Sequence, residues 1–257
     1  MDDMIRGTAL RLVHSRKSVA LTGAGISAGS GIPTFRGSQG LWSKYDPAEY
    51  ADIDAFMRNP AKVWVMIKEL LDVITSARPN PAHIALAELE GMGLLSSVIT
   101  QNVDNLHQRA GSKNVIEYHG NNERFYCLEC QARYSLKDFS LKEMPPRCRC
   151  GGIIRPDVVF FGEPIPLKAL ISAEAEARSC ELMLVVGTSA IVYPAANLPY
   201  LAKAAGAKVV EVNLEETPLT GYISDYILKG SAGEILPIIV EEVKRLKLER
   251  GNLGKTF

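Results

Sequence analysis

The chain has 257 residues, of which 47% are hydrophobic and 23% charged, a composition typical of one globular core with a small added module. Its 29 basic and 29 acidic residues balance, which argues against a direct nucleic-acid partner or an anionic lipid surface. No apolar run approaches the ~18 residues of a membrane span, and the acidic first residues do not match a signal peptide. We therefore expect a cytoplasmic protein.

The first predicted elements are a helix over residues 3–15 and a strand over 18–22. The strand opens onto a glycine-rich stretch, GAGISAGSGIPTFRG. Gly23, Gly25 and Ala28 match the G-x-G-x-x-G/A spacing with which a backbone approaches a pyrophosphate, and a helix N-terminus is expected to follow. This spacing also occurs in ordinary glycine turns. The aromatic and cationic tail of the stretch, however, predicts a loop that folds over a cofactor.

Residues 41–77 are aromatic and irregular and then helical over 61–76, which predicts a helical insertion. A helix over 82–92 follows two prolines. Short runs rich in Val and Ile recur along the chain, at 96–100, 115–117, 182–186, 208–213 and 225–228. Further helical patterns lie at 168–178, 195–205 and 233–247. This alternation predicts a buried parallel sheet built from βαβ units.

Two close cysteine pairs interrupt this rhythm, within a segment rich in Cys, Arg and Pro. The pairs are Cys127-x2-Cys130 and Cys148-x-Cys150, a spacing typical of a zinc ribbon with four thiolate ligands. Four thiolates leave no open coordination position, so we expect the zinc to be structural. Cys180 stands alone before a buried strand and is expected to be a core residue.

Polar side chains follow two of the predicted strands. Asn102 and Asp104, after the strand at 96–100, either bracket a polar ring such as a carboxamide or cap the next helical turn. Spacing alone leaves both interpretations open. His119 follows the strand at 115–117. A single histidine is more often structural, but a position at a strand end favours a general base.

Two later strands end in the same way. Gly187, Thr188 and Ser189 follow one of them, and Asn213 ends the next. Small hydroxyl side chains and an amide suit phosphate oxygens and ribose hydroxyls. Because the carboxyl ends of parallel strands meet at one edge of a sheet, these clusters predict a single binding site.

Together these motifs resemble the sirtuin family of NAD-dependent protein deacylases. The resemblance rests on the glycine-rich stretch, TQNVD at 100–104, HG at 119–120, the four cysteines, GTS at 187–189 and VN at 212–213. It implies an α/β fold with a Rossmann-like parallel sheet and a smaller domain made of a helical module and a zinc ribbon. The NAD-binding domain would comprise residues 1–36, 81–121 and 156–257, the helical module 37–80, and the zinc ribbon 122–155.

The resemblance also implies roles for individual residues. His119 would be the general base, while Asn102 and Asp104 would hold the nicotinamide carboxamide as further catalytic residues. The NAD-contacting set would be Gly23, Ala24, Gly25, Ala28, Thr34, Phe35, Arg36, Gln101, Asn102, Asp104, Gly187, Thr188, Ser189, Asn213, Glu215 and Ala232. An acetylated lysine peptide would bind as an added strand along Val158, Val159, Phe160, Phe161 and Gly162. One zinc would bind Cys127, Cys130, Cys148 and Cys150.

The implied reaction removes acetyl groups from protein lysines and yields nicotinamide and O-acetyl-ADP-ribose. Family members that prefer acidic acyl groups carry a Tyr-x-x-Arg pair after the tryptophan that aligns with Trp64. This chain has Ile67 and Leu70 there. An unpaired carboxylate in an apolar tunnel would suffer a large desolvation penalty, so we expect neutral acyl groups.

Three other functions compete with this one. NAD-dependent ADP-ribosyl transfer to protein would use the same pocket. A dehydrogenase is disfavoured, because no acidic residue closes a second strand ~20 residues after the glycines. A zinc-ribbon module that binds nucleic acid or a protein would be a non-catalytic alternative, which the balanced charge and the polar strand ends disfavour.

Overall fold

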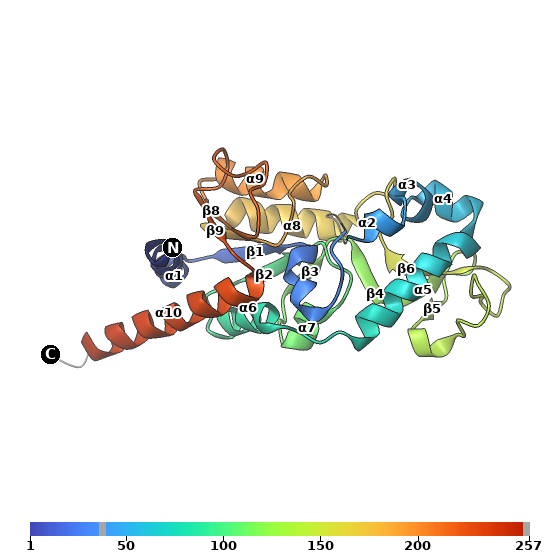
Figure 1. Ribbon diagram of the computed structural model, residues 1–257, viewed down its shortest axis with the longest axis horizontal. Helices are drawn as coiled ribbons and strands as arrows, with labels where there is room; N and C mark the ends of the chain where they lie inside the picture. The colour runs from blue at the N-terminus through green and yellow to red at the C-terminus, as the bar shows by residue number, and fades with distance from the viewer. Residues whose placement is uncertain (36–39, 254–257) are drawn as a thin grey trace.

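The computed structural model describes residues 1–35 and 40–253, with side chains through residue 249. Within these residues the chain forms two lobes, one around a large parallel sheet and one of short helices over a three-stranded sheet (Figure 1). The predicted combination of a Rossmann-like sheet with a smaller helical and cysteine-bearing part is therefore confirmed.

The larger lobe is built on a six-stranded sheet in the order β3-β2-β1-β7-β8-β9, and each neighbouring pair is parallel. The strand order reverses between β1 and β7, and ligands of such sheets bind beyond the carboxyl ends at this reversal. The strands are Ser18–Thr22 (β1), Ser97–Thr100 (β2), Val115–Glu117 (β3), Leu182–Val186 (β7), Lys208–Asn213 (β8) and Tyr226–Lys229 (β9). They confirm the predicted strands to within about one residue.

Helices cover both faces of this sheet (Figure 1). One face buries Leu12 of α1, Leu86 of α6 and Leu236 of α10, and the other buries Ala173 of α8 and Ala202 of α9. These helices are Asp2–His14 (α1), Pro81–Gly91 (α6), Leu167–Ser179 (α8), Leu198–Ala204 (α9) and Ala232–Leu253 (α10), and the short helix Leu106–Ala110 (α7) follows β2. Coverage on both faces explains why the strands read as continuous apolar runs.

Among the described residues, the smaller lobe packs four helices against the sheet β5-β4-β6. The rings of Trp64 and Phe125 stack in its core with centroids 6.2 Å apart, and Trp64 Nε1 donates to the Ile154 carbonyl at 3.0 Å. The longest helix of this lobe begins after Asn59, whose side chain accepts from the Lys62 N–H. The elements are Leu41–Lys44 (α2), Pro47–Tyr50 (α3), Ile53–Arg58 (α4), Pro60–Ser76 (α5), Gly120–Cys127 (β4), Arg133–Tyr134 (β5) and Ile154–Val158 (β6).

The segment after β1 differs from the prediction. Two short 3₁₀ turns, Ala24–Ile26 and Ala28–Ser30, stand where an α-helix N-terminus is predicted. The Gly25 N–H donates to the Gly187 carbonyl at 2.8 Å, and a Cβ on Gly25 would lie 2.8 Å from Gly187 Cα. Here the glycines let the loops after β1 and β7 touch backbone to backbone, and the chain turns back at once instead of starting a long helix.

Candidate functional site

A cavity of about 550 Å³ lies beyond the carboxyl ends of the central strands, between the two lobes. The larger lobe contributes the loops after β1, β2, β7 and β8 to its wall. The smaller lobe contributes side chains of α2 and α5 and the segment after β6. The polar strand ends that the sequence predicts to converge therefore do converge at one place.

Most of the predicted NAD-contacting set lines this cavity: Gly23, Ala24, Gly25, Thr34, Phe35, Gln101, Asn102, Gly187, Thr188, Ser189, Asn213 and Glu215. Three members lie elsewhere. Ala28 is exposed on its 3₁₀ turn, Ala232 is buried in the core at the start of α10, and Asp104 is buried outside the lining. The predicted contact Arg36 lies outside the described residues.

Thr188 ties the strand ends together at the base of the cavity. Gln101 Nε2 donates to its hydroxyl at 3.0 Å, and Asn213 Nδ2 donates to its carbonyl at 2.9 Å. The loops after β2, β7 and β8 are thus fixed relative to one another before any ligand binds.

Asn102 presents an unsatisfied acceptor at the cavity wall. Its Nδ2 donates to the Gly23 carbonyl and to Ser27 Oγ, both at 3.1 Å. Its Oδ1 is buried and has no hydrogen-bond partner among the described residues. A buried amide oxygen without a partner is unfavourable, so a ligand donor such as a carboxamide N–H would satisfy it.

Asp104 lies behind Asn102, not beside it in the lining. Its carboxylate accepts from Ser27 Oγ at 2.7 Å and from the Leu106 N–H at 2.9 Å, at the start of α7. Burial raises the pKa of this carboxyl. Of the two interpretations that the spacing left open, the capping of a helical turn therefore describes Asp104. Asn102 lines the cavity instead, where it can contact a polar ring.

His83 of α6 completes this buried cluster. Its Nδ1 accepts from the Asn80 N–H at 3.3 Å, so Nε2 carries the proton and faces Ser27 Oγ at 3.3 Å. Burial lowers the pKa of His83 to about 4, which keeps the ring neutral at pH 7.

His119 also lines the cavity. Its Nδ1 lies 3.1 Å from the Gln101 carbonyl oxygen. Because a carbonyl can only accept, Nδ1 carries the proton and Nε2 is left as the basic nitrogen. Burial lowers the pKa of His119, so the imidazole is neutral at pH 7 and able to take up a proton.

The opposite wall of the cavity is apolar and aromatic. Phe35 stacks on Trp42 with centroids 5.2 Å apart, and Trp42 lies 6.4 Å from Phe161. Met66, Ile67 and Leu70 of α5 add aliphatic surface. Trp42 and Met66 are absent from the predicted site, because their contact with it depends on how α2 and α5 pack, which no local motif encodes.

The predicted peptide-binding segment lies on the same wall, and Val158, Val159, Phe160, Phe161 and Gly162 all line the cavity. Only the first of these belongs to β6, and a single parallel bridge joins Phe161 to Asp52. The buried side chain of Arg155 holds the segment, since its guanidinium donates to both Glu163 carboxylate oxygens at 2.7 Å. This ion pair is a second feature that the sequence alone does not indicate.

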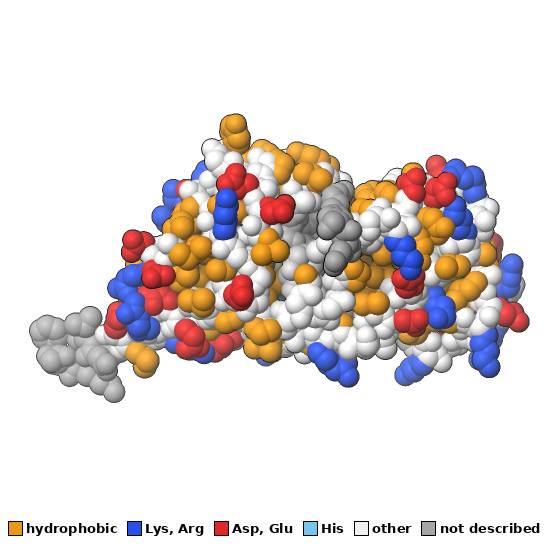
Figure 2. Space-filling view, viewed as in Figure 1, with side chains coloured by type: hydrophobic (Ala, Val, Ile, Leu, Met, Phe, Trp, Pro, Cys, Tyr) orange, Lys and Arg blue, Asp and Glu red, His pale blue; other side chains and the backbone are white. Residues whose placement is uncertain are grey.

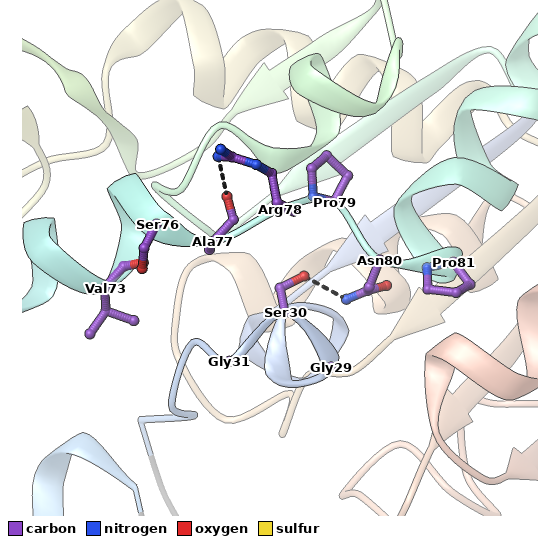
Figure 3. A pocket seen from close by; sticks show the side chains of 10 residues that line it. All are labelled: Gly29, Ser30, Gly31, Val73, Ser76, Ala77, Arg78, Pro79, Asn80 and Pro81. Carbon is purple, nitrogen blue, oxygen red and sulfur yellow. Dashed lines mark hydrogen bonds between the residues drawn. The ribbon is translucent and has the colours of Figure 1, made fainter.

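A second cavity of about 520 Å³ lies between the 3₁₀ turn Ala28–Ser30, with the Gly31 that follows it, and the connection from α5 to α6 (Figure 3). Asn80 Nδ2 donates to Ser30 Oγ at 2.9 Å and to the Ile26 carbonyl at 2.7 Å. The glycine-rich stretch is therefore tied to the start of α6.

The four predicted zinc ligands meet in the smaller lobe. All four Sγ atoms of Cys127, Cys130, Cys148 and Cys150 lie within 4.8 Å of one another. A tetrahedral zinc with bonds of about 2.3 Å requires separations of about 3.8 Å, so the set fits the metal. The Cys150 N–H and the Tyr134 hydroxyl, 2.9 Å away, lower the pKa of the Cys148 thiol to about 6, which favours the thiolate ligand. Cys180 is buried and separate, as predicted.

On the face shown in Figure 2, acidic and basic side chains are interspersed over both lobes. Among the described residues, no helix combines the length and the hydropathy that crossing a membrane requires.

Comparisons with known proteins agree on one family. The model of the Sir2 family matches residues 23–194. NAD-dependent protein deacylase 2 of Archaeoglobus fulgidus is 53% identical over 256 residues, covering 97% of this chain and 100% of the relative. A Sir2 histidine variant solved with a deacetylated p53 peptide and 3′-O-acetyl-ADP-ribose matches with a TM-score of 0.89 and 43% identity, covering 93% of this chain and 98% of that one. Sir2Af2 bound to a myristoylated histone peptide matches with a TM-score of 0.82 and 46% identity, covering 97% and 100%.

Proposed function

Since the chain belongs to the Sir2 family, we propose that the cavity between its lobes brings NAD and an acylated lysine together. The protein is an NAD-dependent protein deacylase that acts on peptide substrates and carries a structural zinc site. With an acetylated substrate, its products are free lysine, nicotinamide and O-acetyl-ADP-ribose. ADP-ribosyl transfer and a purely binding zinc module are not favoured.

NAD supplies an anomeric carbon whose leaving group is a cationic nicotinamide ring. The observation that supports the position of the nicotinamide end is the unpartnered Oδ1 of Asn102, because this oxygen can accept from the carboxamide N–H. Asp104 acts through Ser27, which it holds against Asn102. Gly23, Ala24 and Gly25 would face the phosphates, together with Ser189 and the predicted contact Arg36, and Asn213 would hold the adenosine ribose.

His119 is the proposed general base. Its side chain lines the cavity, and Nε2 is the ring nitrogen left to accept a proton, since Nδ1 is bound to the Gln101 carbonyl. A neutral imidazole in this state takes a proton from a ribose hydroxyl and so makes the oxygen nucleophilic. The stacked rings of Phe35 and Trp42 form an apolar wall of the cavity and are proposed to shield the reacting atoms from water.

The substrate peptide is proposed to lie along Val158–Gly162 as an added strand, with the acyl-lysine pointing toward the aliphatic side chains of α5. The apolar wall supports neutral acyl chains, and the related Sir2Af2 binds a myristoylated peptide.

We propose the domain division 1–36, 81–121 and 156–257 for NAD binding, 37–80 for the helical module and 122–155 for the zinc ribbon. In the structure β4 and β6 run across two of these boundaries. Four clustered zinc-binding thiols support action in a reducing compartment such as the cytoplasm.

Replacing His119 tests the proposed base. His119→Ala should lower turnover by about 10²–10⁴-fold, the usual contribution of general-base assistance, without changing the zinc content or the melting temperature. Turnover of an acetyl-lysine peptide is measured by mass spectrometry. His14→Ala, which changes a histidine on α1, is the matched control and should leave turnover unchanged. Near-normal turnover in His119→Ala would remove His119 from the mechanism.

The pH profile provides an independent readout of the same residue. The pKa of His119 is lowered below 6.5 by burial, partly offset by the Gln101 carbonyl. A base must be unprotonated, so the wild-type rate is full above this pKa and falls as the pH drops through it. The His119→Ala profile should lack this acid limb, and an unchanged limb would assign it to another group.

A further inference from the structure

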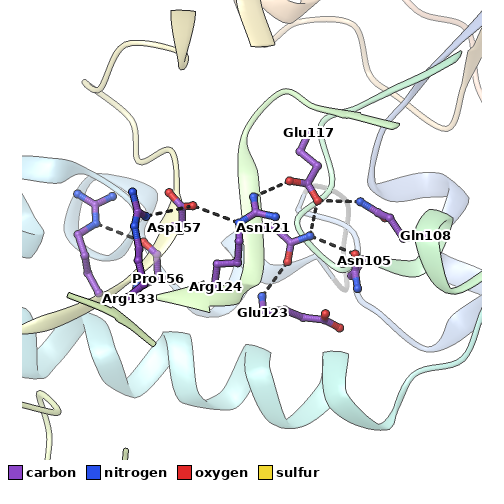
Figure 4. Close-up of polar contacts among 10 residues, drawn as sticks. Asn105, Gln108, Glu117, Asn121, Glu123, Arg124, Arg133, Pro156 and Asp157 are labelled. Atoms are coloured by element: carbon purple, nitrogen blue, oxygen red, sulfur yellow. Dashed lines mark hydrogen bonds and ion pairs between the residues drawn. The ribbon is translucent and has the colours of Figure 1, made fainter. Parts of the chain in front are cut away.

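A polar cluster outside the cavity surrounds Glu117, which ends β3 two residues before His119 (Figure 4). Glu117 Oε1 accepts from Gln108 Nε2 at 2.7 Å and from Asn121 Nδ2 at 2.5 Å. Its Oε2 accepts from Arg124 Nη2 at 2.5 Å. One carboxylate thus joins the end of β3 to α7 and to β4.

The cluster adjoins residues 101–105, which we term the catalytic loop because they include Asn102. The chain that follows Glu117 is bonded along one edge of this loop. The bonds are His119 Nδ1 to the Gln101 carbonyl (3.1 Å), the Asn122 N–H to the Val103 carbonyl (2.9 Å) and Asn121 Nδ2 to Asn105 Oδ1 (3.2 Å). The position of the catalytic loop therefore depends on where β4 begins.

Asn121 is the link between Glu117 and the catalytic loop. Its side chain is buried, and its Nδ2 divides its hydrogen bonding between Glu117 and Asn105. Asn105 has φ +61°, a left-handed conformation that asparagine tolerates better than most residues. The other end of the amide, Oδ1, accepts from the Glu123 N–H at 2.8 Å, so the carboxylate is the partner that fixes Nδ2, the atom that faces Asn105.

The two carboxylate oxygens differ in their surroundings. Oε1 receives its bonds from Gln108 and Asn121, beside the catalytic loop. Oε2 pairs with Arg124, whose side chain is 50% exposed and reaches on to Asp157 of β6 at 3.2 Å. Solvent-exposed ion pairs contribute little, so the Oε1 side is the functional one.

We propose that Glu117 is a positioning residue for nicotinamide cleavage, holding Asn121 and Gln108 so that the catalytic loop presents Asn102 to the ring. The inference rests on the proposed role of Asn102. It deepens that role by naming the residue outside the cavity that keeps Asn102 in place.

Three variants separate the contacts of the two carboxylate oxygens. Glu117→Ala removes the Oε1 hydrogen bonds and the Oε2 ion pair together. Glu117→Gln keeps a neutral acceptor oxygen for Gln108 and Asn121 but loses the ion pair. Arg124→Ala removes the ion pairs of this arginine with Glu117 and Asp157, leaves the Oε1 contacts of Glu117 in place, and is the matched control. The readouts are the turnover number and the inhibition constant of added nicotinamide, with an acetyl-lysine peptide and the full-length protein. A loss of folded protein lowers turnover but does not move an inhibition constant.

Glu117→Ala should lower turnover and raise the nicotinamide inhibition constant, each by about tenfold, the effect of losing a hydrogen bond to a charged group. Glu117→Gln and Arg124→Ala should stay within about threefold of the wild type in both. The proposal is wrong if Glu117→Ala leaves the inhibition constant unchanged, or if Arg124→Ala raises it as much. Asn102→Ala is measured alongside. An unchanged inhibition constant in Asn102→Ala would contradict the role of Asn102 and with it the route by which Glu117 acts. A raised constant in Asn102→Ala with an unchanged one in Glu117→Ala would contradict the role of Glu117 alone.

Discussion

At the scale of single residues, His119 and Asn102 are arranged in the same way. Each has one end bound to the protein and one end left for a ligand. His119 Nδ1 is bound to a backbone carbonyl and Nε2 is left basic, while Asn102 Nδ2 is bound twice and Oδ1 is left without a partner. The free atoms are therefore fixed in direction before substrate binds, which is how a preorganised site stabilises developing charge without reorganisation.

The acyl preference is also decided by single residues. Ile67 and Leu70 line the cavity, and no lysine or arginine does so among the described residues. A succinyl carboxylate would therefore enter apolar surroundings without a cation, and we expect deacetylation to exceed desuccinylation by at least about tenfold. The values of kcat/KM on matched acetyl and succinyl peptides measure this ratio.

Leu70→Arg is the informative variant for this prediction, because it adds the missing cation on α5. It should raise kcat/KM for desuccinylation and so reduce the ratio of deacetylation to desuccinylation. Faster desuccinylation than deacetylation by the wild type would show that the cavity wall does not set the preference.

At the scale of elements, the strands and most helices could be predicted from the sequence because their apolar runs are long, buried on both faces and bounded by glycine or polar residues. The 3₁₀ turns after β1 could not. They arise from the close contact of Gly25 with Gly187, two glycines far apart in the chain. A G-x-G spacing indicates a close approach of the backbone to another group, but it does not distinguish a phosphate from another loop.

The zinc-bearing element should depend on its metal. Zinc binding to four thiolates is worth roughly 10–16 kcal/mol apparent, and the small sheet β5-β4-β6 contributes Phe125, Cys127 and Ile154 to the buried apolar core of its lobe. Cys130→Ser should abolish the bound zinc, lower the melting temperature and remove activity indirectly. Metal analysis and thermal unfolding measure these effects.

Cys180→Ala is the matched control for the zinc prediction, since Cys180 is buried in the larger lobe and belongs to no cysteine cluster. It should retain one zinc per chain. A Cys130→Ser protein that kept full activity and a native melting curve without zinc would contradict a structural role for the metal.

At the scale of the whole molecule, the site is a junction that no single motif describes. The sequence predicts the larger-lobe side of the cavity well, because its residues follow strands whose ends must meet at one edge. Trp42 and Met66 escape prediction because they reach the cavity only through the packing of the smaller lobe. Arg155 escapes it because it acts on the cavity wall only through its ion pair with Glu163. Asp104 belongs to a motif that is clear in the sequence, but its position behind Ser27, outside the cavity lining, depends on three-dimensional contacts that the motif does not encode.

The most direct test of the account is mass spectrometry of an acetyl-lysine peptide incubated with the purified protein, with and without NAD. We predict that the peptide loses the acetyl mass only when NAD is present, and that nicotinamide and O-acetyl-ADP-ribose appear in equal amounts. A peptide that gains the mass of ADP-ribose, or one that stays unchanged while NAD remains intact, would contradict deacylation as the function of this site.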